Sequence, residues 1–401
     1  MVPEGWSTTK LKTLLEGAVK NGYSPIACEE ETGYWVLGLG ALGDDRFNPK
    51  EIKPVEPTEK VRGALLYSGD FLVSRSNTPD KVGRSIMYKG EVPQCSYPDL
   101  MMRFRINPAY ANPDFIEHKL KSSDIRRYFK NSAAGSSASM VKINKGVLEN
   151  TPIYLPPLPE QKKIAQILST WDQAITATER LLESSQQRKK GLMQQLLTGK
   201  KRLPGFEGEW SVRCLGDLFA ERNESGTDNS PLLSITSNEG VIYQDESGRK
   251  DTSNADKSKY KRICPGDIGY NTMRMWQGRS SLSDKDGVVS PAYTILAPIK
   301  EADSLFFSYL FKLPAMVHVF YRRSQGLVSD TWNLKYTHFK KIEWMVPPKT
   351  EQAAIGKTLL ISDFEISALK VKLDCLKQEK KALMQELLTG KRRVNAETEA
   401  A

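Results

Sequence analysis

Two polar loops carry the side chains of this sequence that are best suited to hydrogen-bonding chemistry. One reads SRSNTPDKVGRS (residues 74–85) and the other NTMRMWQGRSS (residues 271–281), and each follows a short run that begins with Gly-Asp. Arginine can donate paired hydrogen bonds to guanine, asparagine and glutamine can pair with adenine, and lysine mostly contacts phosphate. These side chains would therefore suit the edges of DNA bases.

Two further segments, residues 131–144 and 322–333, place small and polar residues around a glycine. Glycine lets a backbone approach a phosphate or a groove closely. Each segment taken alone could equally be a solvated surface loop, but their recurrence in both halves of the chain favours a function. The candidate DNA-contacting residues are Arg75, Ser76, Asn77, Lys81, Arg84, Ser136, Ser137, Lys142, Asn271, Arg274, Trp276, Gln277, Arg279, Arg322, Arg323 and Gln325.

An internal repeat organises the elements that must position these loops. Residues 156–202 and 347–393 align without a gap, with 22 identities in 47 positions, and both end in LLTGK followed by basic residues. Weaker echoes pair residues 4–14 with 208–218 and residues 69–75 with 266–272. The chain is therefore a tandem duplication, with a divergent globular part and a better-kept helical part in each half.

Each well-kept segment has the heptad pattern of a long helix, because apolar residues return alternately after four and three positions. A helix of about 35 residues is roughly 50 Å long, which is too long for one small core. We therefore expect the two helices to pack against each other, antiparallel because the chain returns through a globular domain. The seam residues are Ile164, Leu168, Trp171, Ile175, Leu182, Leu192, Leu196, Ile355, Leu359, Ile366, Leu369, Leu373, Leu376, Leu383 and Leu387.

The ends of both helices carry capping signals. Prolines precede each helix, in PPLPEQ and PPKTEQ, and Gly199 and Gly390 are expected to end them. Residues 200–202 are expected to interact with the negative end of their own helix dipole. Lys189 and Lys380 occupy equivalent seam positions, where they either fix the register of the pair or extend to the surface.

The globular parts lack helical periodicity over most of their length and contain short β-like runs broken by Gly, Pro and Asn. One helix is predicted in each, at residues 114–131 and 304–324. The fold class is α+β: two tandem globular α/β domains separated by two long helices in an antiparallel coiled coil, with pseudo-twofold internal symmetry. The predicted boundaries are 1–150 and 204–341 for the globular domains, 151–203 and 342–393 for the helical repeats, and 394–401 for a disordered tail.

The sequence offers partial catalytic motifs but no complete one. NPAY (residues 107–110) and NPDF (residues 112–115) resemble the Asn-Pro-Pro-aromatic loop of amino-methyltransferases, yet both lack the second proline, and no glycine-rich turn for S-adenosylmethionine precedes them. GKT (residues 356–358) lies within the heptad pattern and lacks the first glycine of a phosphate loop. The three histidines are scattered without metal-ligand spacing: His118, His318 and His338. We predict no catalytic residue and no metal site.

Composition bounds the remaining possibilities. The chain has 401 residues with 39% apolar residues and a net charge of +10, which indicates folded domains with a preference for a polyanion. No stretch has the length and apolarity of a membrane span or signal peptide, so we expect a soluble cytoplasmic protein. The five cysteines are widely spaced without a CxxC pair, which favours reduced thiols.

The repeated segments resemble a known family. PLPEQKKIAQIL followed by LMQQLLTGKKRLPGFEGEW, and PPKTEQAAIGKTL followed by LMQELLTGK, are similar to the helical repeats of the DNA specificity subunits of Type I restriction-modification systems. The resemblance covers essentially the whole chain. Glu160, Gln161, Glu351 and Gln352 fall on the family's Pro-Glu-Gln signature at the two helix starts, and we expect them to be structural or partner-facing.

The resemblance implies a non-catalytic subunit in which each of two target recognition domains reads one half of an interrupted DNA sequence. It implies two modification subunits that methylate adenine with S-adenosylmethionine, and two motor-nuclease subunits that use ATP and magnesium; this chain would hold no cofactor itself. Two alternatives remain at this point. A coiled-coil adaptor that joins proteins would not bind DNA in a salt-dependent way, and a stand-alone DNA adenine methyltransferase would bind S-adenosylmethionine alone.

Overall fold

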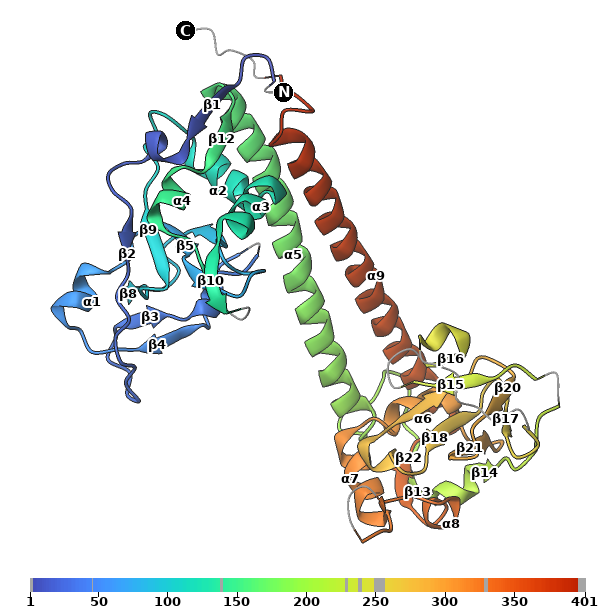
Figure 1. Ribbon diagram of the computed structural model, residues 1–401. Coiled ribbons are helices and arrows are strands. Elements are labelled where there is room, and N and C mark those ends of the chain that lie inside the picture. The colour runs from blue at the N-terminus through green and yellow to red at the C-terminus, as the bar shows by residue number, and fades with distance from the viewer. Residues whose placement is uncertain are drawn as a thin grey trace. The chain divides into compact units, whose positions relative to one another are not determined.

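The structure is a computed structural model that combines helices and sheets (Figure 1). It describes residues 3–44, 46–137, 140–227, 230–236, 240–248, 257–327 and 331–395. Residues 396–401 of the predicted tail lie outside the described residues. The mixture of elements agrees with the α+β class.

Two compact units divide the chain, and each combines a globular domain with parts of both long helices. Unit 1 consists of residues 1–178 and 372–401, and unit 2 of residues 179–371. Helix α5 is Leu158–Leu196 and helix α9 is Lys349–Leu387, each of 39 residues. Each unit therefore contains the start of one long helix and the end of the other.

Short strands, antiparallel except for one parallel pair (β3 with β8), build the globular domain of unit 1, drawn in blue and cyan in Figure 1. Its four-stranded sheet has the order β2 (Lys20–Asn21), β9 (Met101–Phe104), β5 (Phe71–Ser74), β7 (Ser85–Met87). The three-stranded sheets are β4 (Ile52–Pro54), β3 (Trp35–Leu37), β8 (Cys95–Ser96), and β10 (Ala134–Ser137), β11 (Met140–Lys142), β6 (Ser76–Asn77). The helices are α1 (Glu59–Gly63), α2 (Pro113–Lys121), α3 (Ser123–Ser132) and α4 (Lys145–Glu149).

Unit 2 repeats this plan. Its four-stranded sheet has the order β14 (Phe219–Glu221), β21 (Tyr293–Pro298), β18 (Ile268–Asn271), β19 (Ser280–Leu282). Two-stranded sheets join β15 (Leu233–Ile235) to β16 (Val241–Tyr243) and β17 (Lys261–Ile263) to β20 (Gly287–Val289). The helices are α6 (Ser304–Leu310), α7 (Pro314–Arg323) and α8 (Tyr336–Phe339).

The same strand pair closes each domain onto its long helix. In unit 1, β1 (Ser7–Lys10) pairs antiparallel with β12 (Pro152–Leu155), and in unit 2, β13 (Ser211–Cys214) pairs with β22 (Glu343–Val346). In both units, the strand that immediately precedes the long helix therefore pairs with the first strand of the domain. The echo between residues 4–14 and 208–218 therefore reflects an equivalent structural role.

The prediction of one domain helix per half is wrong, because each predicted range contains two shorter helices, and α1, α4 and α8 occur outside those ranges. Ser122, between α2 and α3, has φ −66° and ψ 154°, which is extended rather than helical. Pro314 lacks an amide hydrogen and disfavours a helical conformation at Leu313, so α6 and α7 bend by 80°. Among the described residues no single helix is long and apolar enough to span a membrane; α6 and α7 reach that length and composition only as a bent pair.

The largest hydrophobic core cluster of each unit unites its domain with the two long helices. In unit 1, Ile164 and Leu168 of α5 and Leu387 of α9 pack with Phe115, Phe129 and the other buried residues of the domain. In unit 2, Leu196 of α5 and Ile355 and Leu359 of α9 pack with the aromatic side chains of α6 and α7. All predicted seam residues are buried or half-buried.

The Pro-Glu-Gln signature of unit 1 is a buried hydrogen-bonding junction. Glu160 accepts from Arg393 (Nε to Oε1, 2.7 Å; Nη2 to Oε2, 2.9 Å) and from Trp6 Nε1 (3.2 Å). Gln161 accepts from the Asn112 amide, at the N-cap of α2, and donates to Pro156 O, both at 2.8 Å. This junction ties the start of α5 to both ends of the chain and to the domain.

Unit 2 contains the same junction 191 residues later. Glu351 accepts from Arg202 (Nε to Oε1, 2.7 Å; Nη2 to Oε2, 2.6 Å) and from Trp210 Nε1 (3.2 Å), and Gln352 accepts from the Asp303 amide (2.9 Å). The expectation that Arg202 interacts with its own helix dipole is therefore wrong. Its guanidinium finds a buried carboxylate at the start of the other long helix, and a paired charge-assisted contact is stronger than an interaction with a helix end.

The two seam lysines form equivalent ion pairs, one in each unit. Lys189 Nζ lies 2.5 Å from Asp363 Oδ1 in unit 2, and Lys380 Nζ lies 2.6 Å from Asp172 Oδ1 in unit 1. Their side chains are 19% and 5% exposed, so they do not extend into solvent. Within unit 2, Ser185 Oγ also donates a hydrogen bond to Glu365 Oε1 (2.9 Å). Because Ser185 precedes Lys189 in the chain whereas Glu365 follows Asp363, α5 and α9 run antiparallel in this unit. The pairs favour a register-fixing role over the surface alternative.

His118 in α2 is expected to make unit 1 sensitive to acid. It is 4% exposed, its Nδ1 has no hydrogen-bond partner among the described residues, and Asp172 Oδ2 lies 3.9 Å away. Burial, then Lys380 and Lys121, lowers the pKa of His118 to about 3, and Lys89 acts in the same direction while Glu117 opposes it. The histidine is therefore neutral in the folded chain at neutral pH.

Because the folded pKa lies below the unfolded value, the unfolded state binds the extra proton as the pH falls below about 6.5. We expect the free energy of unfolding to lose up to about 1.4 kcal/mol per pH unit from this group between about pH 6 and pH 3. His118→Gln should flatten that dependence in urea unfolding, whereas His318→Gln at an exposed position should not. An equal slope in wild type and His118→Gln would contradict the assignment.

Candidate nucleic-acid interface

Strand pairing brings the two polar segments of unit 1 together. In the register of β6 and β11, Ser76 faces Lys142 and Asn77 faces Val141. The Ile143 amide also donates to Arg75 O at 2.9 Å. Strand β10, which contains Ser136 and Ser137, pairs with the other edge of β11. Candidate residues from both segments therefore lie on one small sheet.

The candidates of unit 1 differ in their accessibility. Lys81 and Lys142 are exposed, and half-buried Arg75 donates from Nη1 to Asp99 O (3.4 Å). Ser76 and Asn77, by contrast, are only 1% and 8% exposed. The structure therefore contradicts their selection as base contacts, because β6 is covered by its own domain. The side chains of Ser136 and Ser137 lie outside the described residues, as do residues 138–139.

Arg84 lies apart from that sheet, at the end of the first polar loop. Its Nη2 donates to Asp44 Oδ2 at 2.6 Å, while its Nε is buried without a hydrogen-bond partner among the described residues. The residue lines a cavity of unit 1 with side chains from α3 and α9. Arg84 therefore lies in the wall of a pocket and not in an open loop that could contact DNA bases.

An aromatic cluster joins the two polar segments of unit 2. The ring of Trp276, in the 3₁₀ helix η5 (Met275–Gln277), lies 5.3 Å from that of Trp332, which lies 4.9 Å from Tyr321. Trp276 Nε1 donates to Met273 O at 3.0 Å. Tyr321 and Met273 are 43% and 44% exposed. Aromatic faces of this kind stack on nucleic-acid bases or insert between them.

Basic and amide side chains surround this cluster. Gln277, Arg279, Arg322, Arg323 and Gln325 are exposed. Arg274 and Asn271 are half-buried, and Asn271 Oδ1 accepts from the Met273 amide (2.9 Å), which fixes the loop after β18. Residues 328–330 of the second segment lie outside the described residues.

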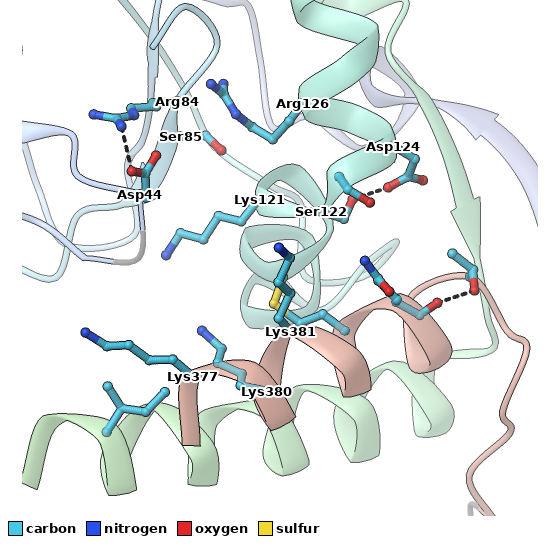
Figure 2. A pocket seen from close by; sticks show the side chains of 15 residues that line it. Asp44, Arg84, Ser85, Lys121, Ser122, Asp124, Arg126, Lys377, Lys380 and Lys381 are labelled. Atoms are coloured by element: carbon cyan, nitrogen blue, oxygen red, sulfur yellow. Dashed lines mark hydrogen bonds and ion pairs between the residues drawn. The ribbon is translucent and has the colours of Figure 1, made fainter. Parts of the chain in front are cut away.

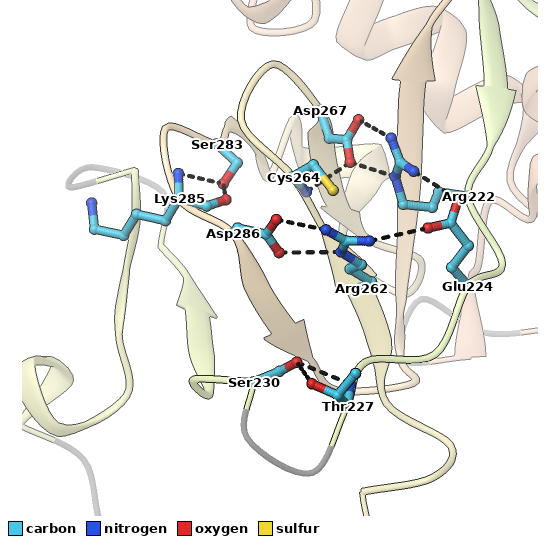
Figure 3. Close-up of polar contacts among 10 residues, drawn as sticks. All are labelled: Arg222, Glu224, Thr227, Ser230, Arg262, Cys264, Asp267, Ser283, Lys285 and Asp286. Atoms are coloured by element: carbon cyan, nitrogen blue, oxygen red, sulfur yellow. Dashed lines mark hydrogen bonds and ion pairs between the residues drawn. The ribbon is translucent and has the colours of Figure 1, made fainter.

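Other arginines of unit 2 are held in structural ion pairs (Figure 3). Arg222 donates to both carboxylate oxygens of buried Asp267 (2.7 and 3.2 Å), and Arg262 to both of Asp286 (3.2 and 2.8 Å). The hydrogen bond to Asp267, opposed by burial, raises the pKa of Arg222. In unit 1 the equivalent Asp70 binds Arg105 (2.6 Å) and Arg103 (3.3 Å). The Gly-Asp motif before each polar loop thus anchors a strand.

Sequence reasoning missed Trp332 and Tyr321, although both belong to or adjoin a segment that it selected. The available signal was the aromatic content of RRSQGLVSDTWN beside its arginines. Their importance depends on contact with Trp276, which is distant in sequence. No group of three or more metal-ligating His, Cys, Asp or Glu side chains occurs in the described part of the chain.

The two Asn-Pro motifs have local structural roles. Asn107 Oδ1 accepts from the Ala109 amide (3.0 Å), and Asn112 Oδ1 caps α2 by accepting from the Phe115 amide (2.9 Å). Gly356 of the GKT motif lies within α9 beside α6, where an added Cβ would be 3.0 Å from Phe306 N. These motifs therefore offer no support for methyl transfer or nucleotide binding.

The chain is similar to known proteins over most of its length. A family model for the Type I restriction modification DNA specificity domain matches residues 3–184. The putative type I restriction enzyme MjaX specificity subunit of Methanocaldococcus jannaschii is 26% identical over 427 residues, covering 98% of this chain and 95% of that protein.

Two solved structures share the fold. The crystal structure of a Type I restriction-modification S subunit from M. genitalium has a TM-score of 0.60 and 15% identity, covering 95% of this chain and 96% of that one. A chain from a study of the assembly and conformational transition of the type I restriction-modification system has a TM-score of 0.56 and 17% identity, covering 98% and 100%. The chain is thus similar over nearly its whole length to a type I restriction enzyme specificity subunit, its residues 3–184 match the specificity-domain model, and it shares the fold of the two solved structures.

Proposed function

We propose that this non-catalytic specificity subunit reads an interrupted DNA sequence, one half with each globular domain. The observation that carries the proposal is that both units bring two separate polar segments to one place, through β6 and β11 in unit 1 and through Trp276 and Trp332 in unit 2. The exposed residues at these places differ between the units, so the two half-sites should differ in sequence. We propose that the two reading domains are residues 1–150 and residues 204–341.

The long helices are proposed to form an antiparallel coiled coil that spaces the two domains. Support comes from the equal lengths of α5 and α9, from the buried or half-buried seam, and from the ion pair repeated in each unit. A reader duplicated about a pseudo-twofold axis suits two half-sites on one face of a duplex, whose groove repeats every 34–36 Å.

The proposed partners are two modification subunits and two motor-nuclease subunits, besides double-stranded DNA. We propose that S-adenosylmethionine, ATP and magnesium are bound by those partners rather than by this chain. Because the target is cellular DNA, the proposed location is the cytoplasm. The structural likeness to a chain of an assembled system supports a role within a complex, and the stoichiometry is part of the proposal.

The test is co-expression with the modification subunit of the same system, followed by sequencing of methylated bases. We expect adenine methylation at a sequence with two defined parts and an undefined gap, and none with the modification subunit alone. Purified chain should also bind DNA with a steep salt dependence, since each phosphate contact contributes about −0.9 to the slope of log K against log salt. Salt-independent or absent DNA binding would favour the adaptor alternative.

Shortening both helices by one heptad should shorten the gap between half-sites. Removing residues 176–182 from α5 and 370–376 from α9 preserves both lysine–aspartate pairs, because the deleted segments face each other in that antiparallel register. Seven residues span about 10 Å of helix, or roughly three base pairs of duplex. Methylation mapping should show a gap about three base pairs shorter; an unchanged gap would refute the spacer role.

A further inference from the structure

A cavity of about 350 Å³ lies in unit 1 between the globular domain and the C-terminal part of α9. Figure 2 shows Arg84 and Arg126 on one side, Lys377, Lys380 and Lys381 on the other, and Lys121 between them. The remaining lining residues include Asp44, Ser85, Ser122, Asp124 and Gln385. Side chains from α2, α3, α9 and the first polar loop thus converge on one space.

Positive charge exceeds negative charge around this cavity. Six basic residues and two acidic ones line it. Ion pairs to residues beyond the lining join Lys121 to Glu117 (2.8 Å), Lys380 to Asp172 (2.6 Å) and Asp124 to Lys119 (2.8 Å). Within the lining itself, basic side chains outnumber carboxylates by six to two. A surplus of this kind in a partly buried space favours an anion.

Two buried hydrogen-bond donors of residues that line the cavity have no acceptor among the described residues. Ser85 is 3% exposed, and its Oγ has no partner in the described part of the chain. The same holds for the buried Nε of Arg84. Arg126 donates to the carbonyl oxygens of Val82 (2.6 Å) and Asp80 (2.8 Å), which leaves its charge uncompensated by those bonds. Burial, and then the charge of Arg84, lowers the pKa of Arg126, while the carboxylates of Asp44 and Asp80 oppose that shift.

From this geometry we propose that the cavity binds a phosphate group. Guanidinium donors match the oxygens of a phosphate, and the space far exceeds the roughly 30 Å³ of a water molecule. The phosphate comes either from the backbone of DNA bound by the first domain or from a free phosphate compound such as a nucleotide. The first source rests on the proposed function, and the second does not.

The proposed site lies in unit 1, although the long helix that carries three of its lysines, α9, is repeated in the chain as α5. At the positions 191 residues away, Lys380 and Lys381 correspond to Lys189 and Lys190, and Arg126 corresponds to Val317. The repeat thus conserves the helix lysines but not the arginine. Lys190, which is exposed on α5 as Lys381 is on α9, provides a matched control.

The experiment compares the full-length chain with Lys381→Ala, Arg84→Gln and the control Lys190→Ala. Thermal unfolding followed by circular dichroism first establishes that all variants fold. Binding to a mixed-sequence duplex is then measured over a range of salt concentrations. Isothermal titration calorimetry measures the binding of inorganic phosphate and of ATP. The readouts do not require knowledge of the target sequence.

If a DNA phosphate occupies the cavity, Lys381→Ala and Arg84→Gln each lower the magnitude of the salt slope by about one, and Lys190→Ala does not. If a free compound occupies it, wild type binds phosphate or ATP, both cavity variants lose at least tenfold in affinity, and the DNA slope is unchanged. The proposal is overturned if neither measurement changes, or if Lys190→Ala has the same effect. If the chain bound all duplexes equally, the proposed sequence specificity would be refuted. The test of the cavity would still hold, because it does not depend on the DNA sequence.

Discussion

Replacement of Gln161 by leucine is expected to lower the free energy of unfolding of unit 1 by about 2–6 kcal/mol. Gln161 is 1% exposed and joins the Asn112 amide to Pro156 O, each at 2.8 Å. Leucine would leave both backbone groups without a partner, and each buried unpaired group costs about 1–3 kcal/mol. Urea unfolding followed by circular dichroism measures the loss.

Gln173→Leu is the matched control, because Gln173 is exposed on the same helix. Its effect should stay within about 0.5 kcal/mol. Gln352→Leu should reproduce the loss in unit 2, where Gln352 joins the Asp303 amide to Pro347 O, both at 2.9 Å. If Gln161→Leu were no more destabilising than Gln173→Leu, the buried junction would not hold the domain to its helix.

Exchange of the first domain is expected to change one half of the recognised DNA sequence completely. The donor is the corresponding domain of the M. jannaschii relative, which aligns over nearly the whole chain. The exchanged domain must keep its contacts with the long helices: the Lys119 Nζ bond to Leu388 O (2.9 Å) and the Asn112 amide bond to Gln161. The β1–β12 pair uses backbone bonds and tolerates a different sequence.

The long helices could be predicted from the sequence because their signals are local. Heptad spacing, preceding prolines and closing glycines determine a helix without reference to the rest of the chain. Both helices occur, and Gly199 and Gly390 adopt φ of +71° and +69° just beyond their ends. The 191-residue repeat also predicted which positions would be equivalent, as the Lys189–Asp363 and Lys380–Asp172 pairs show.

Non-local contacts could not be predicted in this way. Arg202 finds Glu351 at a separation of 149 residues, and only the folded junction shows that this contact prevails over the nearby helix end. Ser76 and Asn77 are buried in a strand, β6, that pairs with β11. The sequences of these short polar strands do not predict that pairing. Trp332 belongs to the candidate interface because its ring contacts that of Trp276, which is distant in sequence. Side-chain type identified suitable loops, but tertiary packing decides which residues remain exposed.

The most direct test of two-part recognition is methylation mapping of the wild-type chain and the chain with the exchanged first domain, each co-expressed with the same modification subunit. We predict two sequences that share one half-site and the gap length and differ in the other half-site. A change in both half-sites, or an unchanged sequence, would contradict the account.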